Sequence, residues 1–163
     1  MRWSEFQEAA PDLARLAEER FGRTGVAILG TIRQDGSPRI SAIEPVISHD
    51  ELLLGMMWQS RKALDLIRDP RCVIHSVIAD PDGSDGEVKL YGRAVESQDF
   101  GEEKWQYQVI RERWRAGAPE AFHVFTVEIE RAAYIAYDIG KGEMTVTQWD
   151  ARRGVREMGR AYP

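Results

Sequence analysis

The chain has 163 residues, of which 43% are hydrophobic and 30% charged, values typical of one globular domain and not of a disordered or fibrous protein. The formal net charge of -5, with lysines and arginines spread along the chain, argues against a nucleic-acid partner. Cys72 is the only cysteine, which excludes an intrachain disulfide and favours a reducing compartment.

The N-terminal segment predicts a helix and no targeting signal. Ser4 and Gln7 have the spacing of a capping box, and apolar residues recur at helical intervals within residues 1–22, interrupted near Pro11. The first residues lack the basic, apolar and small-residue succession of a signal peptide, and the apolar run at residues 73–79 is too short to span a bilayer. We therefore expect a cytoplasmic protein without a membrane partner.

Alternating apolar and polar residues then predict a run of strands. Asp35-Gly36 is a strong hairpin turn, and a short helix at residues 60–68 ends before Asp69-Pro70. The strands expected in this part of the chain span residues 26–32, 38–48, 52–58, 72–79 and 87–97.

The rest of the chain continues this pattern. A helix is predicted at residues 99–117, followed by a long strand at residues 122–137 and a shorter one at residues 144–149. Residues 155–158 are a weaker candidate for a last strand. Six or seven strands joined mostly by hairpins, with helices inserted between them, indicate a mainly β protein, an antiparallel barrel with accessory helices. We expect a single domain over residues 1–163, with a core barrel at residues 24–98 and C-terminal strands within residues 122–158.

The tripeptide Ser60-Arg61-Lys62 lies where a strand passes into a helix. Free backbone N–H groups, the helix dipole, a hydroxyl and two cations can converge at such a point and bind a phosphate group. For the tripeptide alone, a serine cap followed by two solvated cations is the simpler interpretation, because such caps are common. Arg39, in the second predicted strand, offers a guanidinium that suits the same phosphate, although an exposed strand arginine is the simpler interpretation.

Three motifs together resemble the flavin-binding split β-barrel family of pyridoxamine 5'-phosphate oxidase. They are Asp35-Gly36-Ser37-Pro38-Arg39, Ser60-Arg61-Lys62-Ala63 and Asp69-Pro70-Arg71-Cys72-Val73, and the resemblance is best over residues 24–98. It implies an FMN-binding split barrel of Greek-key type and a homodimer with cofactor sites at the interface.

The resemblance also implies the residues that contact FMN. Arg39 and the Ser60, Arg61 and Lys62 positions match the phosphate side of the family's site. Residues bordering the isoalloxazine ring correspond to Ile40, Ser41, Ala42, Gly55 and Met56. The second subunit contributes the strand that begins with Glu87, where the oxidases have glutamine.

Two departures concern the vitamin substrate of the oxidases. Glu44 stands where they carry a lysine for the substrate phosphate, and residues 147–153 contain no histidine where they carry Arg-x-His. We therefore expect an FMN-dependent oxidoreductase that acts on another small molecule and does not turn over pyridoxamine phosphate usefully. A deazaflavin-dependent reductase and a non-catalytic flavin- or tetrapyrrole-binding protein are the alternatives, and no catalytic residue is assigned.

Other residues with chemical potential are more simply explained by packing. His49, His75 and His123 lack a metal-ligand spacing, so no metal site is expected. Cys72 reads as a small core residue. Trp58 and Trp149 are open to two interpretations, as cleft walls or as core residues.

Overall fold

The structure is a computed structural model that describes residues 1–48, 50–80, 83–97 and 121–161. The helix expected at residues 99–117 and His49 lie outside these ranges. The helices are α1 (Trp3–Ala9), α2 (Pro11–Thr24) and α3 (Arg61–Arg68); the strands are β1 (Ala27–Ile32), β2 (Pro38–Ile43), β3 (Pro45–Ser48), β4 (Glu51–Met57), β5 (Arg71–Ser76), β6 (Glu87–Glu96), β7 (Phe122–Asp138), β8 (Glu143–Asp150) and β9 (Gly154–Ala161).

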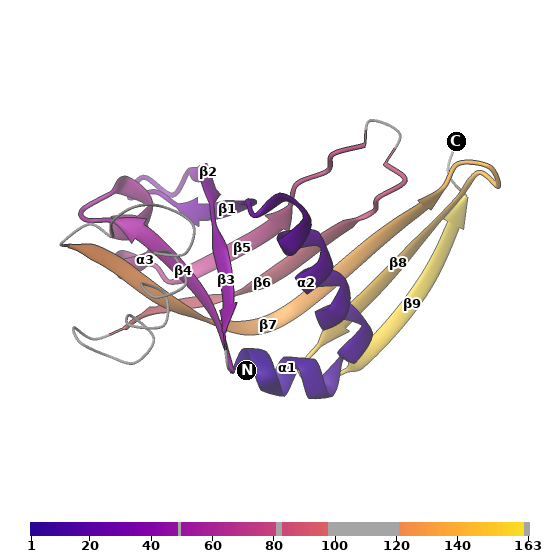
Figure 1. Ribbon diagram of the computed structural model, residues 1–163, viewed down its shortest axis with the longest axis horizontal. Coiled ribbons are helices and arrows are strands. Elements are labelled where there is room, and N and C mark those ends of the chain that lie inside the picture. The colour runs from indigo at the N-terminus through magenta and orange to yellow at the C-terminus, as the bar shows by residue number, and fades with distance from the viewer. Residues whose placement is uncertain (49, 81–82, 98–120, 162–163) are drawn as a thin grey trace.

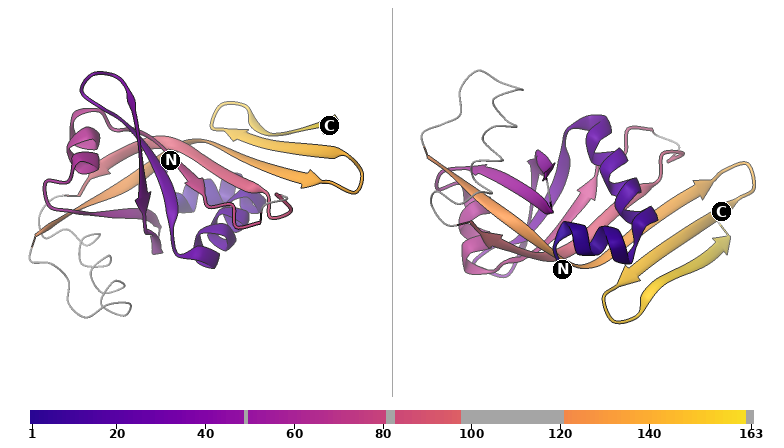
Figure 2. Two further views of the ribbon diagram at one scale, coloured as in Figure 1. Left: turned by 90° about the horizontal axis from the view of Figure 1, so that it is seen from above. Right: turned by 60° about the horizontal axis from the view of Figure 1, so that its bottom comes forward.

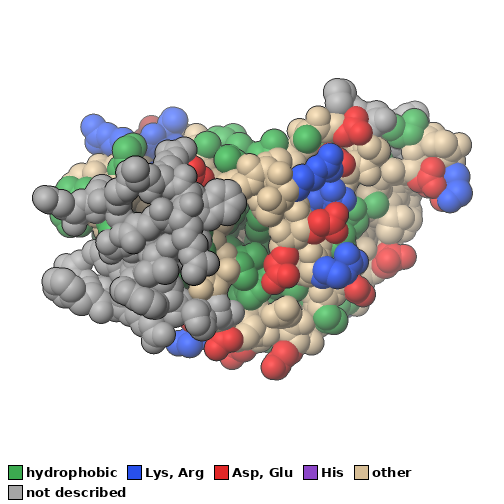
Figure 3. All heavy atoms as spheres, viewed as in Figure 1, with side chains coloured by type: hydrophobic (Ala, Val, Ile, Leu, Met, Phe, Trp, Pro, Cys, Tyr) green, Lys and Arg blue, Asp and Glu red, His purple; other side chains and the backbone are tan. Residues whose placement is uncertain are grey.

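The predicted break in the N-terminal helix is confirmed. Ala10, with φ -148° and ψ 65°, separates α1 from α2, and Pro11 occupies the first turn of α2, where its missing N–H costs nothing. Gly25 ends α2 at φ 65° and donates its N–H to the carbonyl of Phe21, a left-handed cap that glycine adopts without strain. On the described part of the face shown in Figure 3, acidic and basic side chains intermingle. Arg23 in α2 forms an ion pair with Asp85.

The strands form one nine-stranded sheet with only antiparallel pairings in the described part of the chain, so the expected antiparallel β fold with accessory helices is confirmed. The main path runs β2-β1-β5-β6-β7-β4-β3. Its two end strands, β2 and β3, are separated in the chain only by Glu44. The sheet must therefore curl until its ends meet, which makes a barrel (Figure 1).

The sequence predicted one strand over residues 38–48, and that prediction was wrong. The ladder between β1 and β2 ends at Ile43, and Pro45 starts β3 on the opposite end of the path. Proline has no N–H to continue the ladder and restricts the backbone of Glu44 before it. This split and the full strand β9 account for nine strands where six or seven were expected.

The long strand β7 connects the barrel to a C-terminal hairpin. Its first residues pair with β4 and its last ones with β8, while β6 follows it for most of its length. β8 and β9 extend away from the barrel (Figures 1 and 2). The helix pair α1 and α2 packs near them, where the ring of Phe6 lies 5.0 Å from that of Trp149.

The core joins the helices to the barrel. The alternation predicted for β7 is present, because Phe125, Val127 and Ile129 are buried while Glu128 and Glu130 are exposed. Trp149 is 2% exposed, so its side chain is a core residue. Across the described ranges, none of the helices is long and apolar enough to cross a membrane.

Candidate functional site

The turn between β4 and α3 places Ser60 at the start of the helix. Ser60 has an extended backbone, with φ -63° and ψ 147°, and its N–H donates to the Met57 carbonyl at 3.1 Å. Its hydroxyl makes no capping bond, and among the described residues the buried Oγ atom has no hydrogen-bond partner. A buried hydroxyl beside free helix N–H groups leaves hydrogen-bonding capacity for an anionic ligand.

Lys62 is not a freely solvated cation. Its Nζ donates to the carbonyl of Ala42 at 2.7 Å and so ties α3 to β2. Burial lowers the pKa of the Lys62 ammonium group, and the negative charge of Glu44 opposes that shift. The lysine therefore links two segments of the predicted site, and a nearby anion would restore its ordinary pKa.

Arg39 is held by a buried carboxylate on α3. The Arg39 Nε lies 2.6 Å from Oδ2 of Asp65, which also accepts a bond of 3.0 Å from the Thr31 hydroxyl. Asp65 is only 5% exposed. Burial alone would raise its pKa, but the hydrogen bonds from Arg39 and Thr31 outweigh burial and hold the pKa of Asp65 below its usual value.

An open cleft of about 630 Å³ adjoins this pair; we call it the arginine cleft. Four arginines line it together with two aspartates, so its net charge is positive. The lining residues are Arg33, Gln34, Asp35, Arg39, Arg61, Leu64, Asp65 and Arg68. The structure thus brings Arg39 and Arg61 together, while Ser60 and Lys62 lie outside this lining.

The residues predicted to border the flavin ring differ in accessibility. On β2, Ile40 is 75% exposed and Ala42 shares its exposed face, whereas Ser41 is half-buried on the other face. On β4, Gly55 is half-buried, and Met56 is 4% exposed with its side chain in the core. Of Met56, only the backbone is available to a ligand.

Glu87 is buried and compensated within its own chain. Its carboxylate lies 2.8 Å from Lys89 Nζ and 2.8 Å from His75 Nε2, while His75 Nδ1 lies 2.6 Å from the Ser76 carbonyl. Both ring nitrogens of His75 therefore lie against oxygen atoms of its own chain. Burial raises the pKa of Glu87, but the bonds from Lys89 and His75 outweigh that effect and lower it overall.

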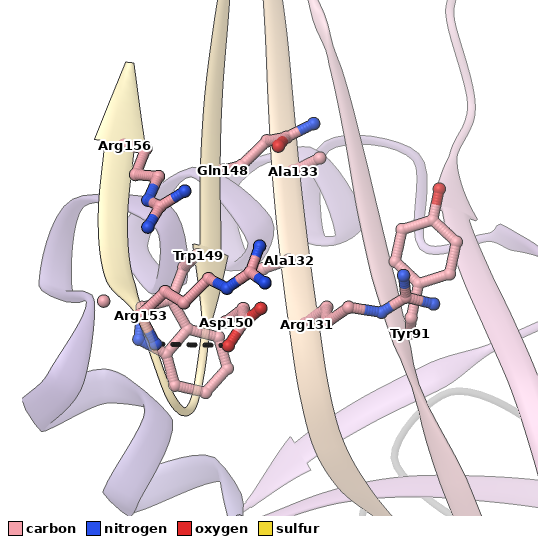
Figure 4. A pocket seen from close by; sticks show the side chains of 10 residues that line it. Tyr91, Arg131, Ala132, Ala133, Gln148, Trp149, Asp150, Arg153 and Arg156 are labelled. Atoms are coloured by element: carbon pink, nitrogen blue, oxygen red, sulfur yellow. Dashed lines mark hydrogen bonds between the residues drawn. The ribbon is translucent and has the colours of Figure 1, made fainter.

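A second pocket, the hairpin pocket, was not found from the sequence. It has a volume of about 340 Å³ and lies over β6–β9 (Figure 4). Arg131, Arg153 and Arg156 line it, and the Arg131 guanidinium lies 4.8 Å from the centre of the Tyr91 ring. Asp150 also lines it and accepts the backbone N–H groups of Arg152 and Arg153, which lowers the pKa of its carboxyl.

Metal and thiol chemistry find no support in the described ranges. No group of three histidine, cysteine, aspartate or glutamate side chains there could hold a metal ion. Burial raises the pKa of the Cys72 thiol to about 12, so this cysteine is protonated and unreactive at neutral pH. Trp58, in contrast to Trp149, is 54% exposed and stacks on His123.

Comparison with known proteins identifies the family. The model of the family described as pyridoxamine 5'-phosphate oxidase matches residues 14–136. The chain belongs to the pyridoxamine 5'-phosphate oxidase family. No curated protein matches the sequence.

Solved structures share the family fold at low sequence identity. PhzG from Burkholderia lata, in complex with tetrahydrophenazine-1-carboxylic acid, is 12% identical with a TM-score of 0.62, over 90% of this chain and 88% of that one. A putative pyridoxamine 5'-phosphate oxidase from Listeria innocua is 14% identical with a TM-score of 0.60, over 72% and 94%. The heme storage protein HutZ from Vibrio cholerae is 16% identical with a TM-score of 0.59, over 75% and 90%. The fold alone therefore does not select one ligand.

Proposed function

We propose that this chain binds FMN at the β4–α3 turn and acts as an FMN-dependent oxidoreductase on a small anionic molecule. The observation that carries the proposal is the buried Ser60 hydroxyl at the start of α3, which has no hydrogen-bond partner in the part of the chain that the structure describes. A phosphate oxygen supplies the acceptor that this hydroxyl lacks.

The charges around the turn fit a phosphate group. Arg61 is exposed at the first position of α3 and lines the arginine cleft with Arg39. Asp65 holds Arg39 through its Nε atom, and the Nη atoms of a guanidinium can still donate to a ligand. Membership of the family supports FMN as the source of the phosphate. A deazaflavin carries a phosphate too, and is the alternative at the same turn.

Bound FMN would supply hydride or electron transfer, while the protein supplies binding, orientation and electrostatics. The structural neighbour PhzG was solved in complex with a carboxylic acid, which supports an anionic substrate for this chain. Pyridoxamine phosphate is not the proposed substrate, because Glu44 would repel its phosphate where the oxidases carry lysine. We further propose that the chain works as a homodimer with Glu87 and Lys89 facing the partner's cofactor.

Non-catalytic tetrapyrrole binding is the competing function, because HutZ is a heme storage protein. An axial histidine ligand needs a free ring nitrogen. Both nitrogens of His75 and both of His123 are already engaged in hydrogen bonds. The described histidines therefore favour the flavin over the tetrapyrrole.

The proposal is tested by titrating the purified protein with FMN and following flavin fluorescence. Ser60→Ala should weaken FMN binding about tenfold or more, because a hydrogen bond to a charged group contributes about 1.5–3 kcal/mol. It should not destabilise the cofactor-free protein, because the hydroxyl forms no hydrogen bond with any described residue. Ser4→Ala is the matched control, a half-buried serine in α1, and should change neither quantity.

Parallel titrations distinguish the alternatives. Reduction of bound FMN by NADPH or NADH, and reoxidation by an added acceptor, would support the oxidoreductase. If the protein binds hemin with a sharp Soret band and does not bind FMN, the proposed function is wrong and the tetrapyrrole-binding function takes its place. Equal FMN affinity of the wild-type and Ser60→Ala proteins would show that the phosphate lies elsewhere.

A further inference from the structure

Gln59 has a backbone conformation that its side chain does not favour. Its φ of 54° makes it the one non-glycine residue with positive φ among the described residues. Left-handed backbone crowds the Cβ atom of an L-amino acid, and glycine is the usual residue there. Gln59 immediately precedes Ser60, so this backbone sets the direction in which the chain enters α3.

A buried histidine from β7 holds that backbone in place. The Gln59 N–H donates to Nε2 of His123 at 3.1 Å. His123 is 3% exposed, and the Trp58 ring stacks on it with centroids 4.5 Å apart and planes 9° from parallel. The residue that precedes Gln59 and the residue that binds it are thus packed face to face.

Glu96 on β6 selects the tautomer of His123 that can accept the Gln59 N–H. Its Oε1 lies 2.5 Å from Nδ1 of His123, so the ring donates its Nδ1 proton to the carboxylate. Nε2 is then left unprotonated and able to accept the Gln59 N–H. The two hydrogen bonds require the same tautomer and so support each other.

We propose that His123 is a positioning residue for the anion site: it accepts the Gln59 N–H, stabilises the left-handed turn and thereby aims Ser60 and the first N–H groups of α3 at the ligand. This role depends on His123 in β7 and Glu96 in β6. Both strands lie outside the Ser60-Arg61-Lys62 motif in the sequence. The inference rests on the proposed function only for the identity of the ligand.

The test combines an FMN titration with amide hydrogen exchange of the cofactor-free protein. His123→Phe keeps a flat ring against Trp58 but removes the acceptor. It should weaken FMN binding about tenfold and speed exchange of the Gln59 amide by a similar factor, which corresponds to about 1.4 kcal/mol. His123→Gln, whose side-chain oxygen can accept the same N–H, should restore most of both properties.

A second-site change separates positioning from a general packing role. Gln59→Gly in the His123→Phe background should recover FMN affinity, because glycine adopts the turn without the hydrogen bond. Gln59→Ala in the same background is the matched control, and should not recover it because alanine keeps the strained Cβ. Equal recovery by the glycine and alanine variants would overturn the proposal.

One measurement needs no variant. In ¹⁵N-labelled wild-type protein, the N–H···N bond predicts a scalar coupling between the Gln59 amide nitrogen and His123 Nε2. A protonated Nε2 without that coupling would overturn the inference, whatever the ligand. If the wild-type protein binds no FMN, the proposed function fails, while the coupling and the Gln59 exchange rate still decide the role of His123.

Discussion

Two regions of the molecule gather arginines in different ways. In the arginine cleft, the buried Asp65 pairs with Arg39 at 2.6 Å and with Arg68 at 3.5 Å. In the hairpin pocket, Arg131, Arg153 and Arg156 line the cavity, and none of them forms an ion pair within the described part of the chain.

Positive charge therefore has a structural role in the arginine cleft and a different role in the hairpin pocket. A buried carboxylate fixes the direction of the guanidinium groups around it and makes them part of the folded structure. Exposed arginines that form no ion pair leave much of their field to the solvent or to a ligand, and salt screens that field. The cleft should therefore contribute to stability, and the hairpin pocket should not.

Removing the charge of Asp65, the buried carboxylate of the arginine cleft, should have the largest effect on stability. Asp65→Asn removes the charge that compensates Arg39 while keeping the side-chain shape. We expect a loss of about 3 kcal/mol in the free energy of unfolding, at the lower end of the range for buried pairs because Arg39 keeps some contact with water. Urea unfolding followed by circular dichroism measures this loss.

The control for Asp65→Asn is an ion pair on the surface. Asp138→Asn disrupts the pair with Lys141, whose partners are 46% and 70% exposed. Solvent screens such exposed pairs, which contribute little to stability, so this variant should unfold almost as the wild type does. Similar losses for the two variants would mean that burial of Asp65 adds nothing to its ion pair.

The pH dependence of stability tests the same carboxylate without removing it. The pKa of Asp65 lies below its usual value in the folded protein, whereas in the unfolded chain it is about 3.9. The ionised carboxylate therefore stabilises the fold above about pH 4, and this stabilisation is lost as the pH falls through the folded-state pKa. The difference in unfolding free energy between wild-type and Asp65→Asn proteins should shrink as the pH is lowered from about 7 to about 3; a constant difference would contradict this.

Much of the fold followed from sequence, and the exceptions have local causes. Strands with one buried face, such as β7, show their alternation directly. β9 is exposed on all its residues, so it has no apolar period, and its full length was underestimated. The chain divides residues 38–48 into two strands at Pro45. Because proline occurs both within edge strands and at strand ends, the sequence did not show this division.

The candidate site was less accessible to sequence reasoning. The motif named Ser60, Arg61 and Lys62, but the pairing of Arg39 with Asp65 joins residues 26 positions apart. His123 was interpreted as a satisfied core residue, and it is buried and hydrogen-bonded as that interpretation required. What the sequence could not show is that one of its bonds goes to Gln59, because this contact depends on how β7 and the β4–α3 turn meet in space.

The smallest expected effects on stability come from replacing one arginine by glutamine in each region. Arg68→Gln removes hydrogen bonds to Asp65 and to the Ile32 carbonyl, so it should cost about 1 kcal/mol. Arg156→Gln removes a charge that forms no ion pair with the described residues, so stability should change by less than about 0.5 kcal/mol. Thermal unfolding of the two variants and the wild type measures these changes in stability, and comparing low with high salt shows how far each depends on charge. A loss from Arg156→Gln that matches Arg68→Gln would show that the hairpin pocket is a structural ion-pair network, and the distinction between the two regions would fail.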